Sequence, residues 1–251
     1  MKQTCSNEIR WQRKITTLAE AVRFIDALGF CVLYPIKGLA LPSLYFSVTG
    51  RDPHVEHKWD EKSEMLWRWK NELPRRRRAF YGKYFKGRGT FISLKFLPHF
   101  LAMNQTAAAP GDFARFYGDG RIREDARAIW EALAKHGPLP TLELRHACRM
   151  ETTAGNRRFK KAMLELQRML VVVHFGAEQE TAAWASGRFE LTCRAFPEET
   201  AAARKTSPEE ARCAIAAKYF ARHAGATQEN LRRIFGWGKR DTAAACAGAT
   251  E

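Results

Sequence analysis

The sequence is short of acidic residues and of long apolar runs, and each shortage excludes a class of protein. Its 251 residues include 27 Asp and Glu against 42 Lys and Arg, which leaves a formal net charge of +15. Repulsion among so many positive charges destabilises a compact fold, so we expect an anionic partner. No uncharged apolar run is long enough to span a bilayer, and neither terminus carries a lysine-rich amphipathic helix. No membrane partner is therefore expected.

Closely spaced cysteines are also missing. The six cysteines are far apart and include no Cys-x-x-Cys pair, whereas zinc sites and disulfide frameworks need paired or clustered cysteines. We therefore expect reduced, mostly packed thiols, no bound metal and no cofactor. The first fourteen residues carry five charged side chains and lack the apolar block that a secretory signal needs, so we expect a cytoplasmic protein.

The sequence does have the composition and periodicity of a folded, mainly helical chain. Apolar residues make up 45% and aromatic residues 12%, which is typical of a globular protein. Helical spacing and capping residues predict the helices, and β-branched or aromatic runs predict the strands. The expected helices cover residues 18–28, 60–73, 93–103, 122–136, 141–148, 153–170, 208–223 and 228–235; the expected strands cover 30–36, 169–175 and 184–193; and 39–60 is expected to be a loop.

The middle of the chain has the order of a known DNA-binding unit. Residues 122–193 are expected to form a helix, a tight turn, two further helices and a hairpin, which is the order of a winged helix-turn-helix domain. A further pair of helices is expected after Ser207, with no wing behind it. The alanine-rich tail from Thr242 is expected to be either a last helical turn or a frayed end.

Most of the excess charge lies in one stretch of the N-terminal half. Residues 66–95 contain ten Lys and Arg and only Glu72 as an acid, so +9 of the +15 lies in thirty residues. Aromatic rings, which can stack on bases, and Gly82, Gly87 and Gly89, which let a ligand approach the backbone, are interleaved with the charges. We predict a nucleic-acid-binding surface formed by Arg75, Arg76, Arg77, Arg78, Tyr81, Lys83, Lys86 and Arg88. The alternative is a solvated basic helix whose aromatic side chains face the core.

The helix expected over 153–170 has a second basic side. Its apolar residues fall on one face, and basic residues lie opposite: Arg157, Lys161 and Arg168, with Arg158 near the edge. This is the charge distribution of a recognition helix that presents its outer face to DNA, so the four residues join the predicted DNA-binding set. Glu165 interrupts the basic side, and the following loop carries Glu178 and Glu180. A protein-contact role for this unit therefore stays an alternative.

Motifs for catalysis or metal binding are weak. His54-Val-Glu-His57, with Asp52 and Asp60 nearby, gathers metal-type ligands. Its spacing matches neither a helical His-Glu-x-x-His motif nor a standard zinc set, so we interpret it as chance clustering. Gly87-Arg-Gly89 is too short for a phosphate-binding loop, and no Gly-x-Ser-x-Gly motif is present. The residues therefore support binding more than catalysis.

Four segments together resemble a known family. They are LGFCVLYPI (28–36), LPRRRRAFYGK (73–83), 111–197 and 207–237. They resemble the AlkZ-related branch of the AlkZ/YcaQ DNA glycosylases. The resemblance implies a mainly α fold with small β hairpins, arranged as tandem winged helix-turn-helix domains around a concave basic surface. It also implies, for active members, excision of alkylated or crosslinked bases from DNA. We accordingly expect a divergent first winged helix in residues 1–110, a second in 111–200 and a shortened third in 201–251.

The resemblance breaks at the family's catalytic positions. Active members carry Gln-x-Gln or Gln-x-Asp in a context such as Leu-Gly-Tyr-x-Gln-x-Asp-Pro-Ile, and here the two positions fall on Val32 and Tyr34. Breaking an N-glycosidic bond requires water held beside a developing cation, which suits an amide and a carboxylate. Valine has no polar atom, and a neutral tyrosine supplies no negative charge. The candidate substitute is Asp26; other nearby carboxylates are Asp52, Glu56 and Asp60.

The leading hypothesis is therefore a DNA-binding tandem winged-helix protein that is related to alkylation-repair glycosylases and lacks their usual catalytic pair. Two alternatives stay open. One is an active monofunctional DNA glycosylase that excises alkylated bases with a displaced carboxylate. The other is a winged-helix transcription regulator. Double-stranded DNA is the expected partner in all three cases, and the first two imply damaged DNA.

Overall fold

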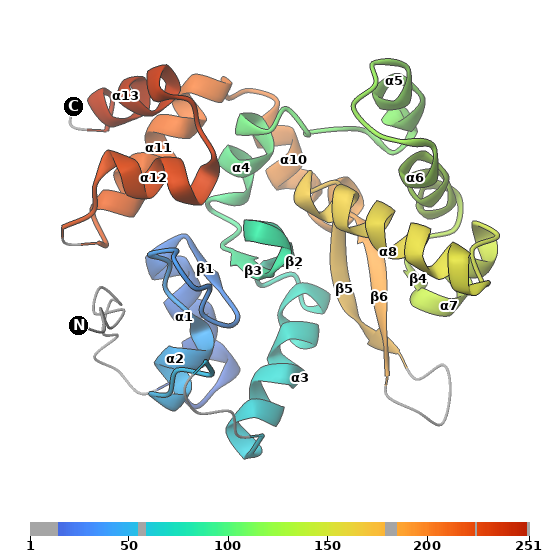
Figure 1. Cartoon of the computed structure of the whole chain (residues 1–251), viewed down its shortest axis with the longest axis horizontal. Coiled ribbons are helices and arrows are strands. Elements are labelled where there is room, and N and C mark those ends of the chain that lie inside the picture. The colour runs from blue at the N-terminus through green and yellow to red at the C-terminus, as the bar shows by residue number, and fades with distance from the viewer. Residues whose placement is uncertain (1–14, 55–58, 179–184, 224, 250–251) are drawn as a thin grey trace.

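The computed structural model describes residues 15–54, 59–178, 185–223 and 225–249. Over these residues the chain is mainly helical, with two small antiparallel three-stranded sheets. Figure 1 shows an N-terminal, a middle and a C-terminal group of elements, with strands β2 and β3 near the centre. The expectation of a mainly α fold with small β elements is confirmed.

The N-terminal unit begins with a helix whose ends the sequence predicts. At the start of α1 (Leu18–Leu28), the Thr17 hydroxyl accepts a hydrogen bond from the Glu20 N–H, and the Glu20 carboxylate accepts one from the Thr17 N–H. Gly29, with a φ of 82°, ends the helix. The unit continues with β1 (Phe30–Val32), α2 (Leu44–Thr49), α3 (Glu61–Arg75), β2 (Phe80–Lys83), the 3-10 turn η1 (Phe85–Gly87) and β3 (Gly89–Ile92).

The middle unit repeats this order of elements. It follows α4 (Leu97–Met103), the 3-10 turn η2 (Pro110–Asp112) and α5 (Phe113–Gly118), and consists of α6 (Glu124–His136), β4 (Leu139–Pro140), α7 (Thr141–Ala147), α8 (Thr153–Arg168), β5 (Val172–Glu178) and β6 (Ser186–Leu191). Strand β6 lies between β4 and β5, as β3 lies between β1 and β2. Each unit is therefore a helix, a strand, two helices and two strands, with its third strand at the centre of the sheet.

The C-terminal elements are helical throughout the residues described there. They are α9 (Thr192–Ala195), α10 (Pro197–Ala203), α11 (Pro208–Phe220), α12 (Gln228–Phe235) and α13 (Lys239–Ala247). Ser207 caps α11 and Thr227 caps α12, as the sequence predicts. The alanine-rich tail forms most of α13.

Three hydrophobic clusters form the interior of the described residues. One lies within the N-terminal unit and includes Phe24 and Leu66, and another lies within the middle unit around Trp130. The third joins the first sheet, through Phe80, to α4, β5 and the C-terminal helices, which contribute Tyr219. The C-terminal helices thus share a core with the N-terminal sheet. The division of the chain at residues 110 and 200 stays a prediction.

Several element predictions are wrong for local reasons. Residues 39–60, expected to be a loop, contain α2, because Ser43 caps a helix that is too short to show a helical period. Residues 80–92, where the sequence predicts no strand, form the β2–β3 hairpin, since glycines and charges hide its alternation. The helix expected to stop before Pro74 runs one residue past it, and the helix expected from Ser93 begins at Leu97.

Candidate nucleic-acid interface

Four consecutive arginines span the last residue of α3 and the turn that leads to β2. All of Arg75–Arg78 are exposed. The Arg77 N–H donates to the Pro74 carbonyl (3.0 Å), and the Arg78 N–H donates to the Leu73 carbonyl (2.8 Å), which is the Schellman pattern of a helix end. Arg77 has a φ of 51°, in the left-handed region where glycine is usual. The turn therefore exposes its arginine side chains, and one of them, Arg77, stands at a position whose backbone conformation favours glycine.

The hairpin that follows adds three exposed cations. Strand β2 buries Phe80 and exposes Lys83 at its end. Lys86 and Arg88 are exposed in and just after η1, and Lys86 also has a left-handed backbone, with a φ of 47°. The predicted basic stretch is therefore a turn and a hairpin, and only its first part is helical.

The outer side of α8 is basic, as the sequence predicts. Thr152 caps the helix, and its inner stripe buries Phe159, Met163 and Leu166. Arg157, Lys161 and Arg168 are exposed on the opposite side. The one acidic residue of this side, the half-buried Glu165, accepts a hydrogen bond from the Arg123 N–H at the start of α6 (3.0 Å).

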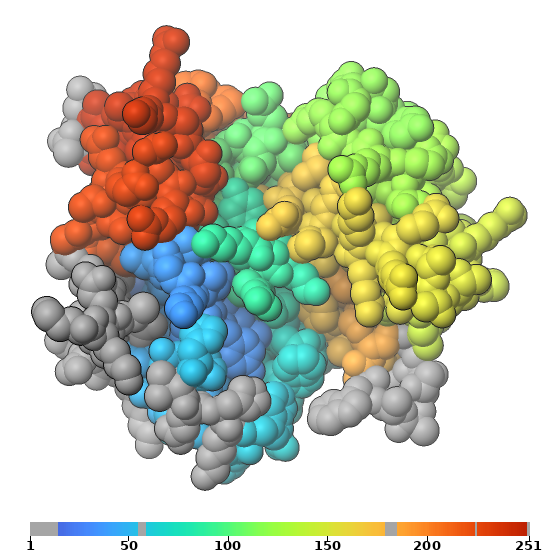
Figure 2. Space-filling view, viewed as in Figure 1, coloured from blue at the N-terminus to red at the C-terminus, as the bar shows by residue number. Residues whose placement is uncertain are grey.

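Two contacts bring α8 against the hairpin. The side-chain oxygen of the buried Gln167 accepts a hydrogen bond from the Lys83 N–H (3.2 Å). Gly87 faces the Leu164 side chain, and a Cβ built at Gly87 would lie 3.9 Å from the Arg168 Nε. Figure 2 shows the blue-green hairpin region between the blue N-terminal unit and the yellow α8 on one face of the molecule. The structure thus brings together two basic segments that lie far apart in the sequence.

Nine exposed cations on these adjoining elements form what we call the basic surface: Arg75, Arg77, Arg78, Lys83, Lys86, Arg88, Arg157, Lys161 and Arg168. None of them forms an ion pair with a carboxylate of the described residues. Two further predicted DNA-binding residues are paired. Arg76 lies 3.0 Å from Glu72, and Arg158 bonds both carboxylate oxygens of Asp125. Arg158 holds the pKa of Asp125 below its usual value.

Most aromatic rings of the basic stretch face inward, as the alternative reading of this stretch expects. Those with less than a tenth of their surface exposed are Trp69, Phe80, Phe85 and Phe91. Tyr81 is half-buried, with its ring 4.7 Å from that of Phe91 and 5.6 Å from that of His174. Trp67 is the exception at 41% exposed, and it packs edge-on against Trp59, which is 48% exposed. Base stacking in this region therefore fits Trp67 better than Tyr81.

The three glycines of the hairpin are explained by packing inside the protein. A Cβ at Gly89 would collide with the Tyr81 ring, one at Gly82 would meet the Phe80 ring, and one at Gly87 would lie 3.1 Å from Leu164. The interpretation that these glycines open the backbone to a ligand is therefore not needed. Their role is to let neighbouring side chains cross the hairpin.

The family's two catalytic positions lie in the N-terminal unit. Val32 is fully buried in β1, opposite Thr90. Tyr34 is half-buried with its ring 4.9 Å from that of Tyr45, and burial raises its pKa. Neither residue supplies a carboxylate or an amide side chain.

The candidate substitute carboxylates have other neighbours. Asp26, half-buried on α1, interacts with Lys95 and Lys218, and burial raises its pKa against the opposing effect of the two lysines. Asp60 caps α3 and pairs with Arg51 at 2.6 Å. No contact joins Asp26 or Asp60 to Tyr34 among the described residues. The structure therefore does not bring these groups together.

The histidine motif before α3 is only partly described. His54 bonds the Pro35 carbonyl through Nε2 (3.2 Å), and Asp52 accepts from the His54 N–H. Glu56 and His57 lie outside the described residues. Among the residues that are described, no three His, Cys, Asp or Glu side chains are placed to hold a metal ion. No described helix has the length and apolar character needed to cross a membrane.

A polar cluster that the sequence does not predict lies between the two units. The Asn71 side-chain oxygen accepts hydrogen bonds from the Lys70 Nζ (3.2 Å) and the His174 Nε2 (2.8 Å). Burial, with Lys70 and Lys83 acting in the same direction, lowers the pKa of His174 to about 3. A signal was present, because His174 is a polar residue inside the apolar run of β5.

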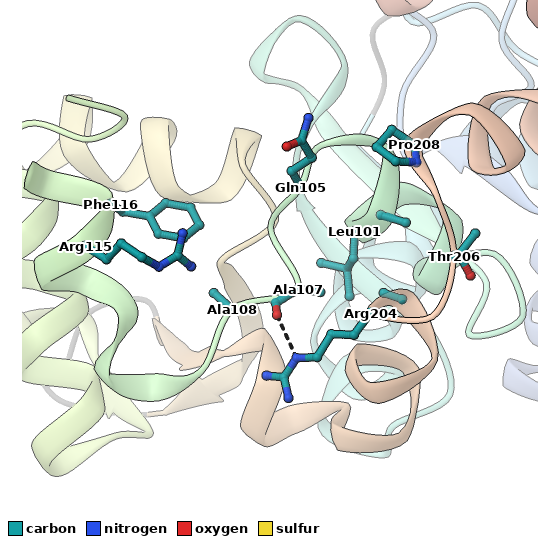
Figure 3. A pocket seen from close by; sticks show the side chains of 11 residues that line it. Leu101, Gln105, Ala107, Ala108, Arg115, Phe116, Arg204, Thr206 and Pro208 are labelled. Atoms are coloured by element: carbon teal, nitrogen blue, oxygen red, sulfur yellow. Dashed lines mark hydrogen bonds between the residues drawn. The ribbon is translucent and has the colours of Figure 1, made fainter. Parts of the chain in front are cut away.

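A hollow of about 260 Å³ lies away from these features, between α4, α5 and the turn from α10 to α11 (Figure 3). Arg115, Phe116 and Arg204 line it together with small apolar side chains. The Arg204 Nε donates to the Ala107 carbonyl (3.0 Å), and Arg115 pairs with Asp112 (3.2 Å). None of the predicted DNA-binding or catalytic residues lines this hollow.

Fold and surface together define a mainly helical protein with two units of like element order, and both units expose cations that have no carboxylate partner among the described residues. The chain belongs to the AlkZ-related family, which matches residues 15–236. The resemblance seen in the sequence is therefore confirmed, and it relates the chain to the AlkZ/YcaQ DNA glycosylases. No curated protein and no solved structure matches the chain.

Proposed function

We propose that the protein binds double-stranded DNA through tandem winged-helix domains. The support for the architecture is the shared order of the two units, since a helix, a strand, two helices and a closing strand pair is the order of a winged helix-turn-helix domain. The C-terminal helices would then be a shortened third unit without a wing. Membership of the AlkZ-related family supports the same reading.

The observation that carries the proposal is the basic surface. Its nine cations are exposed, lack internal carboxylate partners among the described residues, and lie on adjoining elements of both units. Phosphate contacts from such side chains supply the sequence-independent part of DNA affinity. Arg158 is the weakest member of the predicted set, because its guanidinium is already bound to Asp125.

The two units would contribute in different ways. In the middle unit, α8 presents its basic side outward and serves as the recognition helix. In the N-terminal unit, the equivalent helix α3 packs along β5, where Asn71 bonds His174 and Arg75 lies against Gly176. The N-terminal contribution therefore falls to the arginine turn and the β2–β3 hairpin, and not to the face of α3.

Salt dependence tests this proposal. If about five phosphates are neutralised, the logarithm of affinity for a duplex should fall against the logarithm of salt concentration with a slope of roughly −4.5. Fluorescence anisotropy with a labelled duplex over a range of salt measures the slope. A complex that is insensitive to salt would contradict the proposal.

We further propose that the protein lacks the family's usual catalytic pair, because Val32 and Tyr34 occupy its positions. On this view a duplex containing an N7-alkylated guanine, incubated with the protein, accumulates abasic sites no faster than a protein-free control. Faster accumulation that is lost in the Asp26→Asn variant would instead establish the glycosylase alternative, which the family relation favours. Tyr34→Phe separates a role for the tyrosine hydroxyl from one for Asp26. Sequence-specific footprints on undamaged DNA would favour the regulator.

A further inference from the structure

Helix α3 holds a lysine on its buried side. Lys70 is 9% exposed and lies on the same stripe of the helix as the buried Leu66 and Leu73. Its Nζ is 3.7 Å from the centre of the Trp67 ring and donates to the Asn71 side-chain oxygen. It forms no ion pair with a carboxylate of the described residues, so its contacts are an indole face and a neutral amide.

The groups around this amine disfavour its charged form. Strand β2 contributes Lys83, and β5 contributes the neutral His174. Burial, and secondarily the positive charge of Lys83, lower the pKa of Lys70 to about 8. About a tenth of the amine is then uncharged at pH 7 and half at pH 8. Desolvation and a neighbouring cation are the two means by which proteins make a lysine nucleophilic.

The position of the amine connects it to the proposed DNA contact. Lys83 is both its neighbour and a member of the basic surface. Tyr81 interacts with His174 on one side and with Tyr34 on the other, and Tyr34 is the second catalytic position of the family motif. A chain of interactions therefore links the amine, through His174 and Tyr81, to Tyr34, and Lys83 links it to the basic surface.

We propose that the Lys70 amine forms an imine with the aldehyde of an abasic site in DNA, an inference that rests on the proposed DNA binding. The Nζ lone pair attacks C1′ of the ring-opened sugar, and proton transfer gives a carbinolamine. The carbinolamine then loses its hydroxyl as water, so amine and aldehyde yield imine and water with no other reactant. The indole of Trp67 covers the amine and is itself partly exposed, so it must turn aside to admit the sugar.

Reductive trapping tests the proposal. The full-length protein is incubated with a duplex that carries one abasic site, in the presence of sodium cyanoborohydride, which reduces an imine to a stable amine. We expect a covalent complex that falls by at least about tenfold in Lys70→Met. The matched control is Lys62→Met, an exposed lysine of the same helix, which should trap within about twofold of the wild type.

Two further measurements separate the ways of failing. Binding to a duplex with a tetrahydrofuran abasic analogue, which has no aldehyde, reports DNA affinity alone. If the analogue binds but no covalent complex forms, the imine proposal is overturned and DNA binding stands; if the analogue does not bind, the proposed function itself fails. Mass spectrometry of the wild-type complex identifies the modified residue without any variant, and modification at a lysine other than Lys70 would overturn the proposal.

Discussion

Arg77 shows a conflict between stability and charge at a single residue. It occupies the position after a helix end where a left-handed backbone is required and where glycine is the usual residue. A left-handed conformation costs an ordinary residue about 1–2 kcal/mol, and glycine avoids this cost. Part of that advantage is cancelled, because glycine makes the unfolded chain more flexible. The Arg77 side chain is exposed and has no carboxylate partner within the described residues, so contacts inside the protein do not offset the strain. We propose that DNA binding is the reason for an arginine at this position.

Arg77→Gly should therefore change stability and DNA affinity in opposite directions. We expect the free energy of unfolding to stay the same or to rise by about 0.5–1 kcal/mol, because the strain is relieved. Affinity for DNA should fall, with the salt slope reduced by about one. Urea unfolding and anisotropy at several salt concentrations measure the two effects.

Arg149 offers a matched control for this variant. It has a φ of 55° at the end of α7, where the Arg149 N–H donates to the His146 carbonyl and the Met150 N–H to the Arg145 carbonyl. Arg149→Gly relieves the same strain outside the basic surface, so it should match Arg77→Gly in stability and leave the salt slope unchanged. An equal loss of slope in both variants would show that total charge, and not position, controls binding.

His174 should make the fold sensitive to acid. Its folded pKa of about 3 lies below the ordinary value of 6.5, so between these values the unfolded chain binds a proton that the folded protein does not. Stability from this residue is complete above pH 6.5 and is lost as the pH falls toward 3. Between pH 7 and pH 5 we expect a loss of about 2 kcal/mol that is absent from His174→Gln. Urea unfolding at the two pH values measures it, and parallel losses in both proteins would refute the assignment.

At the scale of elements, the sequence predicts what depends on short-range signals. The sequence predicts helix caps at Thr17, Thr141, Thr152 or Thr153, Ser207 and Thr227, and Thr17, Thr152, Ser207 and Thr227 do cap helices. The prediction for Thr141 is wrong, because Pro140 precedes α7 and the Thr141 hydroxyl donates to the Gly187 carbonyl (2.7 Å). The β2–β3 hairpin was not predicted, because glycines and charged residues interrupt the alternation of apolar side chains that marks a strand. Short-range signals thus locate most helix starts, although the end of α3 and the start of α4 differ from the prediction. Strand pairing depends on residues that are distant in the sequence.

The bond between α8 and β2 is an element-scale contact with a measurable effect. The Gln167 side chain is 4% exposed, and its oxygen accepts a hydrogen bond from the Lys83 N–H. Gln167→Leu should lower the free energy of unfolding by about 1–3 kcal/mol, because a partly buried donor loses its acceptor. Lys160→Ala, an exposed change on the same helix, should stay within about 0.5 kcal/mol. Equal stability of the two variants would mean that this bond does not hold α8 to the hairpin.

At the scale of the whole molecule, the sequence predicts the two basic segments of the candidate surface but not that they lie next to each other. Each basic segment is visible as a run or a helical face, because charge and periodicity are local properties. Their junction depends on Gln167 and Leu164 packing against residues about eighty positions earlier in the chain. The Lys70–Asn71–His174 cluster was missed for the same reason, since α3 and β5 meet only in the folded protein.

If both units hold the same DNA, their contributions to the salt slope should add. Arg78→Gln with Lys83→Gln removes two cations from the N-terminal unit, and Lys161→Gln with Arg168→Gln removes two from the middle unit. Each pair should reduce the magnitude of the slope by about 1.8, and all four together by about 3.6. Lys62→Gln with Lys205→Gln removes the same charge from exposed positions outside the basic surface and should leave the slope unchanged. If only one of the two pairs from the basic surface lowers the slope, the unit that carries this pair binds the DNA alone. If all three pairs lower the slope equally, binding depends on net charge and not on the position of the basic surface.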